Sequence, residues 1–392
     1  MNRESFKSSS AGQLVQVWQA DPPYWAFVPH PLPPVLSFDP ELINALSTAD
    51  RAMGELAGLG RLLPNPNLLI QPFMRREAVL SSRIEGTQTG LAELYAFEVQ
   101  QLSLFGGVES PQRLADAREV ANYVTALQYG LKRLKTLPMS LRLMREVHER
   151  LMKGVRGEQA RPGKFRERQN YIGAPGCTLD EATFVPPPVD QMNAALDAFE
   201  KFLHRDDPLP PLIRLACVHY QFEAIHPFID GNGRIGRLLI ALLLNDWNLL
   251  PVPLLYLSAY FERHRDTYYD LLQAVSERGE WSAWLLFFLR GVADQSQEAL
   301  AKAKQLQDLQ HRWHQAVIHA RSSALLFRLI DSLFQTPIIT IPEAARLLDV
   351  TWRSAKLAVQ KLVEAKILTP RDNAKHGRTY IATDIIRIVV ED

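Results

Sequence analysis

The sequence predicts a mainly α-helical protein with a short β-hairpin in its central part and a winged helix-turn-helix module at its C-terminal end. Apolar side chains recur at helical spacing through most of the chain, as at Val120, Val124 and Leu127. This spacing breaks only at residues 171–188 and at residues 324–392, where glycines, turns and short β-branched runs take over. These two interruptions of a helical pattern define the predicted fold class.

Composition and charge exclude several classes of protein. The 392 residues suffice for two or three compact units, and 47% hydrophobic with 22% charged residues is typical of a globular chain. A formal net charge of +1 gives no global field toward nucleic acid or an acidic membrane. Cys177 and Cys217 are too few for a disulfide framework. Because no segment has the apolar length of a signal peptide or a membrane span, we expect a cytoplasmic protein without membrane contact.

The N-terminal part divides into a tail and a helical region. Residues 1–20 are predicted to be a mobile tail, because the first ten residues are polar and rich in serine. Seven prolines between Pro22 and Pro40 then forbid a helix and favour an extended arm. Ser110–Leu134 opens with Ser-Pro, a typical start of a helix. Residues 21–135 are therefore predicted to be an N-terminal helical region.

The rest of the chain is predicted as a core, a linker and a terminal module. Residues 136–290 form a helical core, interrupted by a hairpin at residues 171–188 that is called the flap below. A polar linking helix over residues 291–323 leads to residues 324–392. There a short helix and a longer helix capped by Thr351 precede two β-like pieces, which is the order of a winged helix-turn-helix module.

The segment from His226 to Arg237 reads HPFIDGNGRIGR and lies between two apolar helices. Residues 231–233 favour a tight loop that presents backbone amides at the positive end of the second helix, which is an anion site. Asp230 is a hard oxygen ligand of the kind that Mg²⁺ prefers. Arg234 and Arg237 are three residues apart and can clamp phosphate oxygens together. His226, with an ordinary pKa of about 6.5, can accept a proton at neutral pH.

This segment matches the signature HxFx(D/E)GNGRxxR of Fic proteins at every specified position, namely His226, Phe228, Asp230, Gly231, Asn232, Gly233, Arg234 and Arg237. The chain resembles the family over most of its length, since larger bacterial members also have an N-terminal helical region, a helical Fic core and a C-terminal winged helix. The resemblance implies a protein adenylyltransferase, which transfers AMP from ATP to a Ser, Thr or Tyr hydroxyl of a protein, itself included, and releases pyrophosphate.

The resemblance also assigns roles to single residues. It implies that His226 is the general base and that Asp230 holds a Mg²⁺ ion between the α and β phosphates. It assigns further contacts with ATP to Gly231, Asn232, Gly233, Arg234 and Arg237. Tyr260 is predicted to stack on adenine, with a core or surface position as the alternative.

A second short pattern lies upstream. Ser81, Glu85 and Gly86 match the (S/T)xxxE(G/N) signature of the inhibitory helix of Fic proteins, and their place ahead of the core resembles class II, whose inhibitor is N-terminal and intramolecular. The resemblance implies that Glu85 pairs with Arg237 and misaligns ATP, because the cation is then not free for the γ-phosphate. It also implies that a target protein docks along the flap by strand addition.

Alternative functions stay open at this point. The same site could remove AMP or transfer another nucleotidyl or phosphoryl group, with Glu85 orienting a hydrolytic water. The chain could instead be an ATP-sensing regulator that binds DNA, because residues 351–378 carry seven basic and two acidic residues, a local charge of +5. Winged helices also serve as docking or dimerisation modules, so a homodimer is a further alternative.

Overall fold

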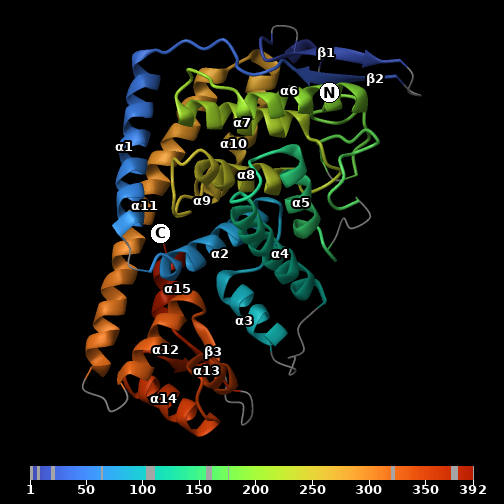
Figure 1. Ribbon diagram of the computed structural model, residues 1–392. Coiled ribbons are helices and arrows are strands. Elements are labelled where there is room, and N and C mark those ends of the chain that lie inside the picture. The colour runs from blue at the N-terminus through green and yellow to red at the C-terminus, as the bar shows by residue number, and fades with distance from the viewer. Residues whose placement is uncertain are drawn as a thin grey trace.

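The computed structural model describes residues 3–6, 9–18, 23–62, 65–102, 111–155, 161–174, 176–318, 323–371 and 378–391. Within these ranges the protein is mainly helical, as predicted (Figure 1). None of the helices in the described ranges has both the length and the apolar character that a membrane crossing requires.

The helices are α1 (Pro40–Leu62), α2 (Asn67–Ile84), α3 (Leu91–Leu102), α4 (Pro111–Arg133), α5 (Leu141–Leu151), α6 (Val189–His204), α7 (Pro211–Ile225), α8 (Asn232–Asp246), α9 (Ser258–Arg263), α10 (Arg265–Arg278), α11 (Trp281–Val317), α12 (Ser323–Gln335), α13 (Ile341–Leu348), α14 (Trp352–Glu364) and α15 (Thr383–Val390). A short 3-10 helix, η1 (Arg3–Phe6), precedes them. The strands are β1 (Gly12–Val17), β2 (Tyr24–Pro29), β3 (Ile338–Thr340), β4 (Thr369–Pro370) and β5 (Thr379–Ile381).

Helices α7 and α8 form the centre of the core. Both carry buried side chains around their whole circumference, and a helix that is apolar on every side belongs in the interior. Helices α4 and α5 pack against α8, while α6, α10 and α11 pack against α7. The indole Nε1 of Trp284 on α11 donates to the carbonyl oxygen of Ala216 on α7 at 3.0 Å. The segment that joins α7 to α8, residues 226–231, is therefore held between two fixed helices.

The long helix α11 connects this core with the C-terminal part. It begins at Trp281 inside the core and runs to Val317, so residues 291–317 of the predicted linking helix continue a core helix. Helix α1 packs along α11, and the two lie side by side in Figure 1.

The N-terminal residues differ from the prediction. Strands β1 and β2 pair as an antiparallel hairpin with Gly12 opposite Pro29, so the mobile tail predicted for residues 1–20 is wrong for the described residues of that range. The reason is apolar burial, because Phe6 is 4% exposed and its ring lies 5.5 Å from that of the fully buried Phe27. The amide of Phe27 also donates to the carbonyl oxygen of Val185 at 2.8 Å, which ties the hairpin to the flap.

The flap, predicted as a hairpin over residues 171–188, has very little strand pairing among its described residues. Its two arms meet in one antiparallel bridge between Ile172 and Phe184, where the amide of Ile172 donates to the carbonyl oxygen of Phe184 at 2.8 Å. Tyr171 and Ile172 of the flap are exposed. Pro175 in its turn lies outside the described residues.

The C-terminal elements follow the predicted order. Strands β3, β5 and β4 form an antiparallel sheet in this spatial order, and Thr351 caps α14 by accepting from the amide of Ser354 at 3.3 Å. The assignment as a winged helix-turn-helix stays a prediction, and residues 372–377 of the proposed basic wing lie outside the described part of the chain. Helices α12 and α15 pack against α2, which lies between the core and these C-terminal helices in Figure 1.

Candidate active site

The loop between α7 and α8, called the motif loop below, depends on two residues with left-handed backbone. Helix α7 ends at His226, which has φ of 49°, and α8 begins after Gly231, which has φ of 79°. A left-handed conformation is strained for a residue other than glycine, and it persists only where the surroundings fix it. The motif loop is therefore expected to have a strong internal and external support.

The internal support comes from Asn232. Its side-chain oxygen accepts from the amide of Phe228, and its side-chain nitrogen donates to the carbonyl oxygen of the same residue, both at 2.8 Å. The Phe228 ring is fully buried and stacks on the imidazole of His148, with centroids 3.8 Å apart. The expectation that Asn232 contacts a ligand through its backbone is compatible with this, because its side chain is used within the loop.

The external support comes from side chains that the sequence did not indicate. The buried Arg166 donates from Nε to the carbonyl oxygen of His226 at 3.0 Å. Asn170 donates to the carbonyl oxygen of Phe228 at 2.8 Å, and His148 Nε2 lies 3.0 Å from the carbonyl oxygen of Asp230. Each bond goes to a backbone carbonyl of the motif loop, so side chains from other segments fix the loop's path.

The side chain of His226 is held as a neutral base. Its Nδ1 lies 3.2 Å from the carbonyl oxygen of Glu223, which can only accept, so Nδ1 carries the proton and Nε2 keeps its lone pair. Burial, together with the nearby Arg166 cation, lowers the pKa of His226 to about 4 even though the bond to Glu223 opposes the shift. At neutral pH the imidazole can therefore accept a proton at Nε2.

A cavity of about 320 Å³ opens at the N-terminal end of α8. It is lined by Glu85, Gly86, Thr87, Glu119, His226, Ile229, Asp230, Gly231, Asn232, Gly233 and Arg234. Arg234 is 6% exposed, and its guanidinium lies 3.4 Å from Glu119 and 3.5 Å from Asp230. Backbone amides, a helix dipole and a cation thus face one space, which suits a phosphate group.

Arg237 lies one turn further along α8 and is closed off by the end of α2. Its Nη2 donates to Glu85 Oε1 at 2.6 Å and to the carbonyl oxygen of Ser81 at 2.9 Å, while Nε donates to Ser81 Oγ at 2.9 Å. The Arg237 side chain is 1% exposed and that of Glu85 is 36% exposed. The predicted pair is thus present, with a buried cation and a carboxylate that reaches solvent.

Electrostatics and backbone shape both favour this pair. Burial alone would raise the pKa of Glu85, but the charge and hydrogen bond of Arg237 outweigh it and hold that pKa below its ordinary value. The carboxylate is therefore ionised at neutral pH. Gly86 has φ of 96° and turns the chain sharply after Glu85. At Gly233 an added Cβ would collide with Glu85 Oε1, so the close approach of the two segments needs this glycine.

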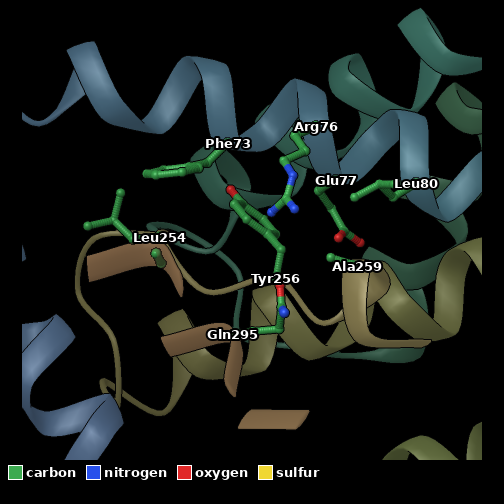
Figure 2. Close-up of a pocket in the computed structure, with 9 residues that line it drawn as sticks. Phe73, Arg76, Glu77, Leu80, Leu254, Tyr256, Ala259 and Gln295 are labelled. Atoms are coloured by element: carbon green, nitrogen blue, oxygen red, sulfur yellow. The ribbon is translucent and has the colours of Figure 1, made fainter. Parts of the chain in front are cut away.

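Helix α2 is anchored two turns before Glu85. The buried Glu77 accepts from Tyr123 Oη at 2.9 Å and from Ser258 Oγ at 2.6 Å. Beside it lies a cavity of about 20 Å³, enough for one water. In Figure 2, Arg76 and Glu77 project from α2 toward Tyr256, and Phe73 lies on the side of Leu254. These bonds of Glu77 hold α2 in place, and with it the position of Glu85 beside Arg237 of α8.

A larger cavity of about 620 Å³ lies on the flap side of the motif loop. It shares Glu85, His226 and Gly233 with the first cavity, so Glu85 stands where the two meet. Glu223 and Tyr269 also line it and were not indicated by the sequence. Both lie on helical stretches without a motif of their own, and only the packing of α10 against α7 brings them together.

Tyr260, predicted to stack on adenine, does not line either of these two cavities among the described residues. It is 6% exposed, and its ring packs against His264 and Phe287 at centroid distances of 4.6 and 4.9 Å. The alternative reading of Tyr260 as a core residue fits this packing, and the adenine role does not.

The resemblance implies a magnesium ion, and Asp230 is the residue that would bind it. In the described part of the chain no three His, Cys, Asp or Glu side chains gather as a metal-binding group. Asp230 is 46% exposed at the mouth of the smaller cavity, with Oδ1 accepting from the amide of Gly231 at 2.6 Å. Mg²⁺ commonly takes one or two carboxylates and fills its shell with phosphates and water. One exposed carboxylate beside an anion site fits that ion.

Fold and site together define a helical protein whose central loop presents backbone amides and the cation of Arg234 to one cavity. The chain belongs to the Fic/DOC family: residues 43–132 match the N-terminal region of that family and residues 138–244 match the family itself. These matches cover about half of the chain.

Similar proteins agree with this membership. The protein adenylyltransferase Fic of Culex quinquefasciatus is 28% identical over 221 residues, which is 55% of this chain and 39% of that protein. The same enzyme of Aedes aegypti is 28% identical over 220 residues, with the same two shares. The chain therefore spans well under half the length of these curated relatives.

Solved structures show the same fold. A Fic family protein from Desulfovibrio desulfuricans G20 superposes with a TM-score of 0.57 at 18% identity, over 90% of this chain and 98% of that chain. Fic-1 from C. elegans superposes with a TM-score of 0.53 at 19% identity, over 68% and 75% of the two chains. At these identities the likeness concerns the fold alone.

Proposed function

We propose that this protein is an adenylyltransferase that transfers AMP from ATP to a Ser, Thr or Tyr hydroxyl of a target protein or of itself. The observation that carries the proposal is the neutral His226 Nε2 at the edge of a cavity lined by the amides of α8 and by Arg234. The names of the Culex and Aedes relatives support the same activity.

The reaction uses groups of this chain at each step. His226 Nε2 takes the proton of the target hydroxyl, the hydroxyl oxygen forms a bond to the α-phosphorus, and the bond from that phosphorus to the bridging oxygen breaks to release pyrophosphate. The amides of residues 231–233 and the guanidinium of Arg234 stabilise the charge on the phosphates. Asp230 would hold Mg²⁺, which supplies further positive charge to the phosphates.

The two cavities suit the two ends of the nucleotide. The smaller cavity, rich in amides and cations, takes the phosphates. The larger cavity takes the base, for which Tyr269 offers a partly exposed ring in place of Tyr260. The exposed side of the flap at Tyr171 and Ile172 is where a target segment adds as a strand.

Glu85 acts as an intramolecular inhibitor in this proposal. Its 2.6 Å bond to Arg237 neutralises the cation that would otherwise bind the γ-phosphate. When Arg237 does not bind the γ-phosphate, the α-phosphate of a bound ATP is not aligned with the hydroxyl that attacks it. The wild-type protein is therefore expected to bind ATP but to transfer AMP slowly.

Intact-mass spectrometry tests the proposal. Wild type, Glu85→Gly and Glu85→Gly/His226→Ala are incubated with Mg²⁺ and each nucleoside triphosphate in turn. We expect a gain of one or more AMP masses with ATP, largest in Glu85→Gly and absent when His226 is replaced. No adduct on Glu85→Gly, nor on any protein of a lysate from the source cell, would overturn the proposed activity.

Removal of AMP is a second candidate, favoured by the place of Glu85. Its carboxylate is partly exposed and borders both cavities together with His226, where it could orient a water toward an AMP-protein bond. An adenylylated substrate that loses AMP faster with wild type than with Glu85→Gly would select this activity.

A further inference from the structure

Glu223 is a carboxyl group of the site that neither transfer nor inhibition has used so far. It lies on the last turn of α7, three residues before His226, and lines the flap-side cavity together with Glu85 and His226. Its Oε1 is buried and has no hydrogen-bond partner among the described residues. A buried carboxyl oxygen without a partner is costly and therefore asks for a functional explanation.

The carboxyl group faces the first turn of α8. A Cβ added at Gly236 would collide with Glu223 Oε1, so the carboxyl group rests directly against the residue that precedes Arg237. In the described structure, Nη1 of Arg237 is likewise buried without a hydrogen-bond partner. Nη1 of Arg237, a donor without a partner, and Oε1 of Glu223, an acceptor without a partner, thus lie in the same region of the described structure. Glu85 accepts from the other terminal nitrogen of Arg237, Nη2.

The charges around Glu223 explain its present state. Burial raises the pKa of Glu223 to about 8, Arg237 opposes this, and the negative charge of Glu85 adds to the increase. The titratable and charged groups around it are His219, Tyr220 and His226 on α7, Arg237 on α8, Glu85 at the end of α2, and Arg265, Tyr268, Tyr269 and Asp270 on α10. While Glu85 neutralises Arg237, Glu223 stays protonated at neutral pH.

We propose that Glu223 is a positioning residue that becomes the counter-ion of Arg237 when Glu85 leaves, and that it competes there with the terminal phosphate of ATP. The proposal rests on the nucleotide site proposed above. It gives Arg237 a second carboxylate inside the core, so that release of Glu85 does not leave a bare guanidinium in a buried place.

This exchange of partners has a consequence for protons. Without Glu85, the negative charge that favoured the neutral form of Glu223 is gone, and Arg237 favours its ionisation. Binding of ATP restores negative charge beside Arg237, so Glu223 must take up a proton as the phosphates arrive. Substitution by glutamine, which has the same shape but does not ionise, removes both the competition and the proton uptake.

Calorimetric titration with MgATP tests the inference in a protein that cannot turn over. Glu85→Gly/His226→Ala is compared with the same protein carrying Glu223→Gln, at pH 8 in buffers of different ionisation enthalpy. We expect uptake of up to about one proton per ATP in the first protein and none at this site in the second. We also expect about tenfold tighter binding by the Glu223→Gln protein at pH 8, and equal binding at pH 6.

Two controls separate the explanations. Asp266→Asn removes an exposed carboxylate of α10 that lines neither cavity, and it should leave proton uptake unchanged. Inorganic tripolyphosphate in place of ATP should reproduce the proton uptake, because the competition concerns phosphate and not the base. Equal affinity and equal proton uptake with and without Glu223 would overturn the inference while leaving the proposed function intact. Absence of ATP binding in both proteins would overturn the proposed function, and this inference with it.

Discussion

The motif loop and the turn of α8 that carries Arg237 are neighbours in one sequence motif, yet they are held in different ways. The buried Arg166 and the half-buried Asn170 bind carbonyl oxygens of the motif loop, and loss of the Arg166 contact would disturb the core. Arg237 is held from outside by Glu85, whose side chain is 36% exposed and belongs to the end of another helix. We call the first region fixed and the second gated. In the proposed function, the fixed region performs the reaction and the gated region controls when it runs.

Replacement of His226 tests the fixed region most severely. In the Glu85→Gly protein, His226→Ala should lower the rate of AMP incorporation by roughly 100- to 10,000-fold, the range for loss of a general base. Radiolabelled ATP measures the rate, and His204→Ala, an exposed histidine of α6, is the matched control. A rate within tenfold of the parent would mean that another group accepts the proton.

Replacement of Glu85 tests the gate. Glu85→Gly, and to a smaller extent Glu85→Gln, should raise AMP incorporation by roughly 10- to 100-fold, because a charge-assisted hydrogen bond to a buried cation contributes about 1.5–3 kcal/mol. The same assay measures it, with Glu55→Gln on the exposed side of α1 as the control. If neither Glu85 variant exceeds wild type, the pair with Arg237 is structural and the comparison of a fixed and a gated region fails.

The sequence identified the residues of the fixed region and of the gated region, but not the side chains that hold them in place. His226, Asp230, Glu85 and Arg237 belong to short local patterns. The structure places the first three around two adjoining cavities and buries Arg237 against Glu85. The supporting residues come from segments far apart in the chain. No spacing rule predicts such contacts, because they arise only when α5, α7 and the segment before the flap pack together. The residues of this kind are His148, Arg166 and Asn170. Glu223 lies only three residues before His226 but belongs to no motif.

Two expectations from the sequence depend on packing that the sequence alone does not reveal. Tyr260 has both a polar hydroxyl and a large apolar ring, and its neighbours in the fold decide which of them matters. The first ten residues look like a polar tail, but pairing of β1 with β2 and the burial of Phe6 and Phe27 give the described residues of this N-terminal part a place in the fold. In both cases tertiary packing, and not local composition, decides where the residues lie.

Arg166 tests how far the fixed region depends on its support. Arg166→Ala removes bonds to the carbonyl oxygens of His226 and Pro187, and it should lower kcat of the Glu85→Gly protein by about tenfold or more, because a misplaced base loses alignment. The apparent affinity for ATP should change less than kcat. Arg168→Ala, an exposed neighbour, is the control, and circular dichroism checks the fold. An unchanged kcat would show that Asn170 and His148 suffice.

Ser258 tests the anchor of the gate. Ser258→Ala removes the 2.6 Å bond to Glu77 and should loosen α2, raising AMP incorporation of otherwise wild-type protein by roughly two- to fivefold, since one hydrogen bond contributes about 1 kcal/mol. The same substitution in the Glu85→Gly protein should have no such effect, because the gate is already open. An equal effect in both backgrounds would place the role of Ser258 outside the gate.

The smallest expected effect is that of pH on the rate of AMP incorporation. It tests whether His226 of the fixed region keeps its low pKa when the gated region is open. Because burial lowers the pKa of His226 to about 4, the base stays neutral on acidification from pH 8 to pH 6, and its protonation begins only below about pH 5. A solvent-exposed histidine would lose half of its neutral form near its ordinary pKa of about 6.5. In Glu85→Gly/Glu223→Gln, where neither carboxyl group titrates beside Arg237, the rate should therefore change by less than about twofold between pH 8 and pH 6. A fall centred near pH 6.5 would show that the motif loop admits water to His226 once the gate is open, so that the fixed region depends on the gated one.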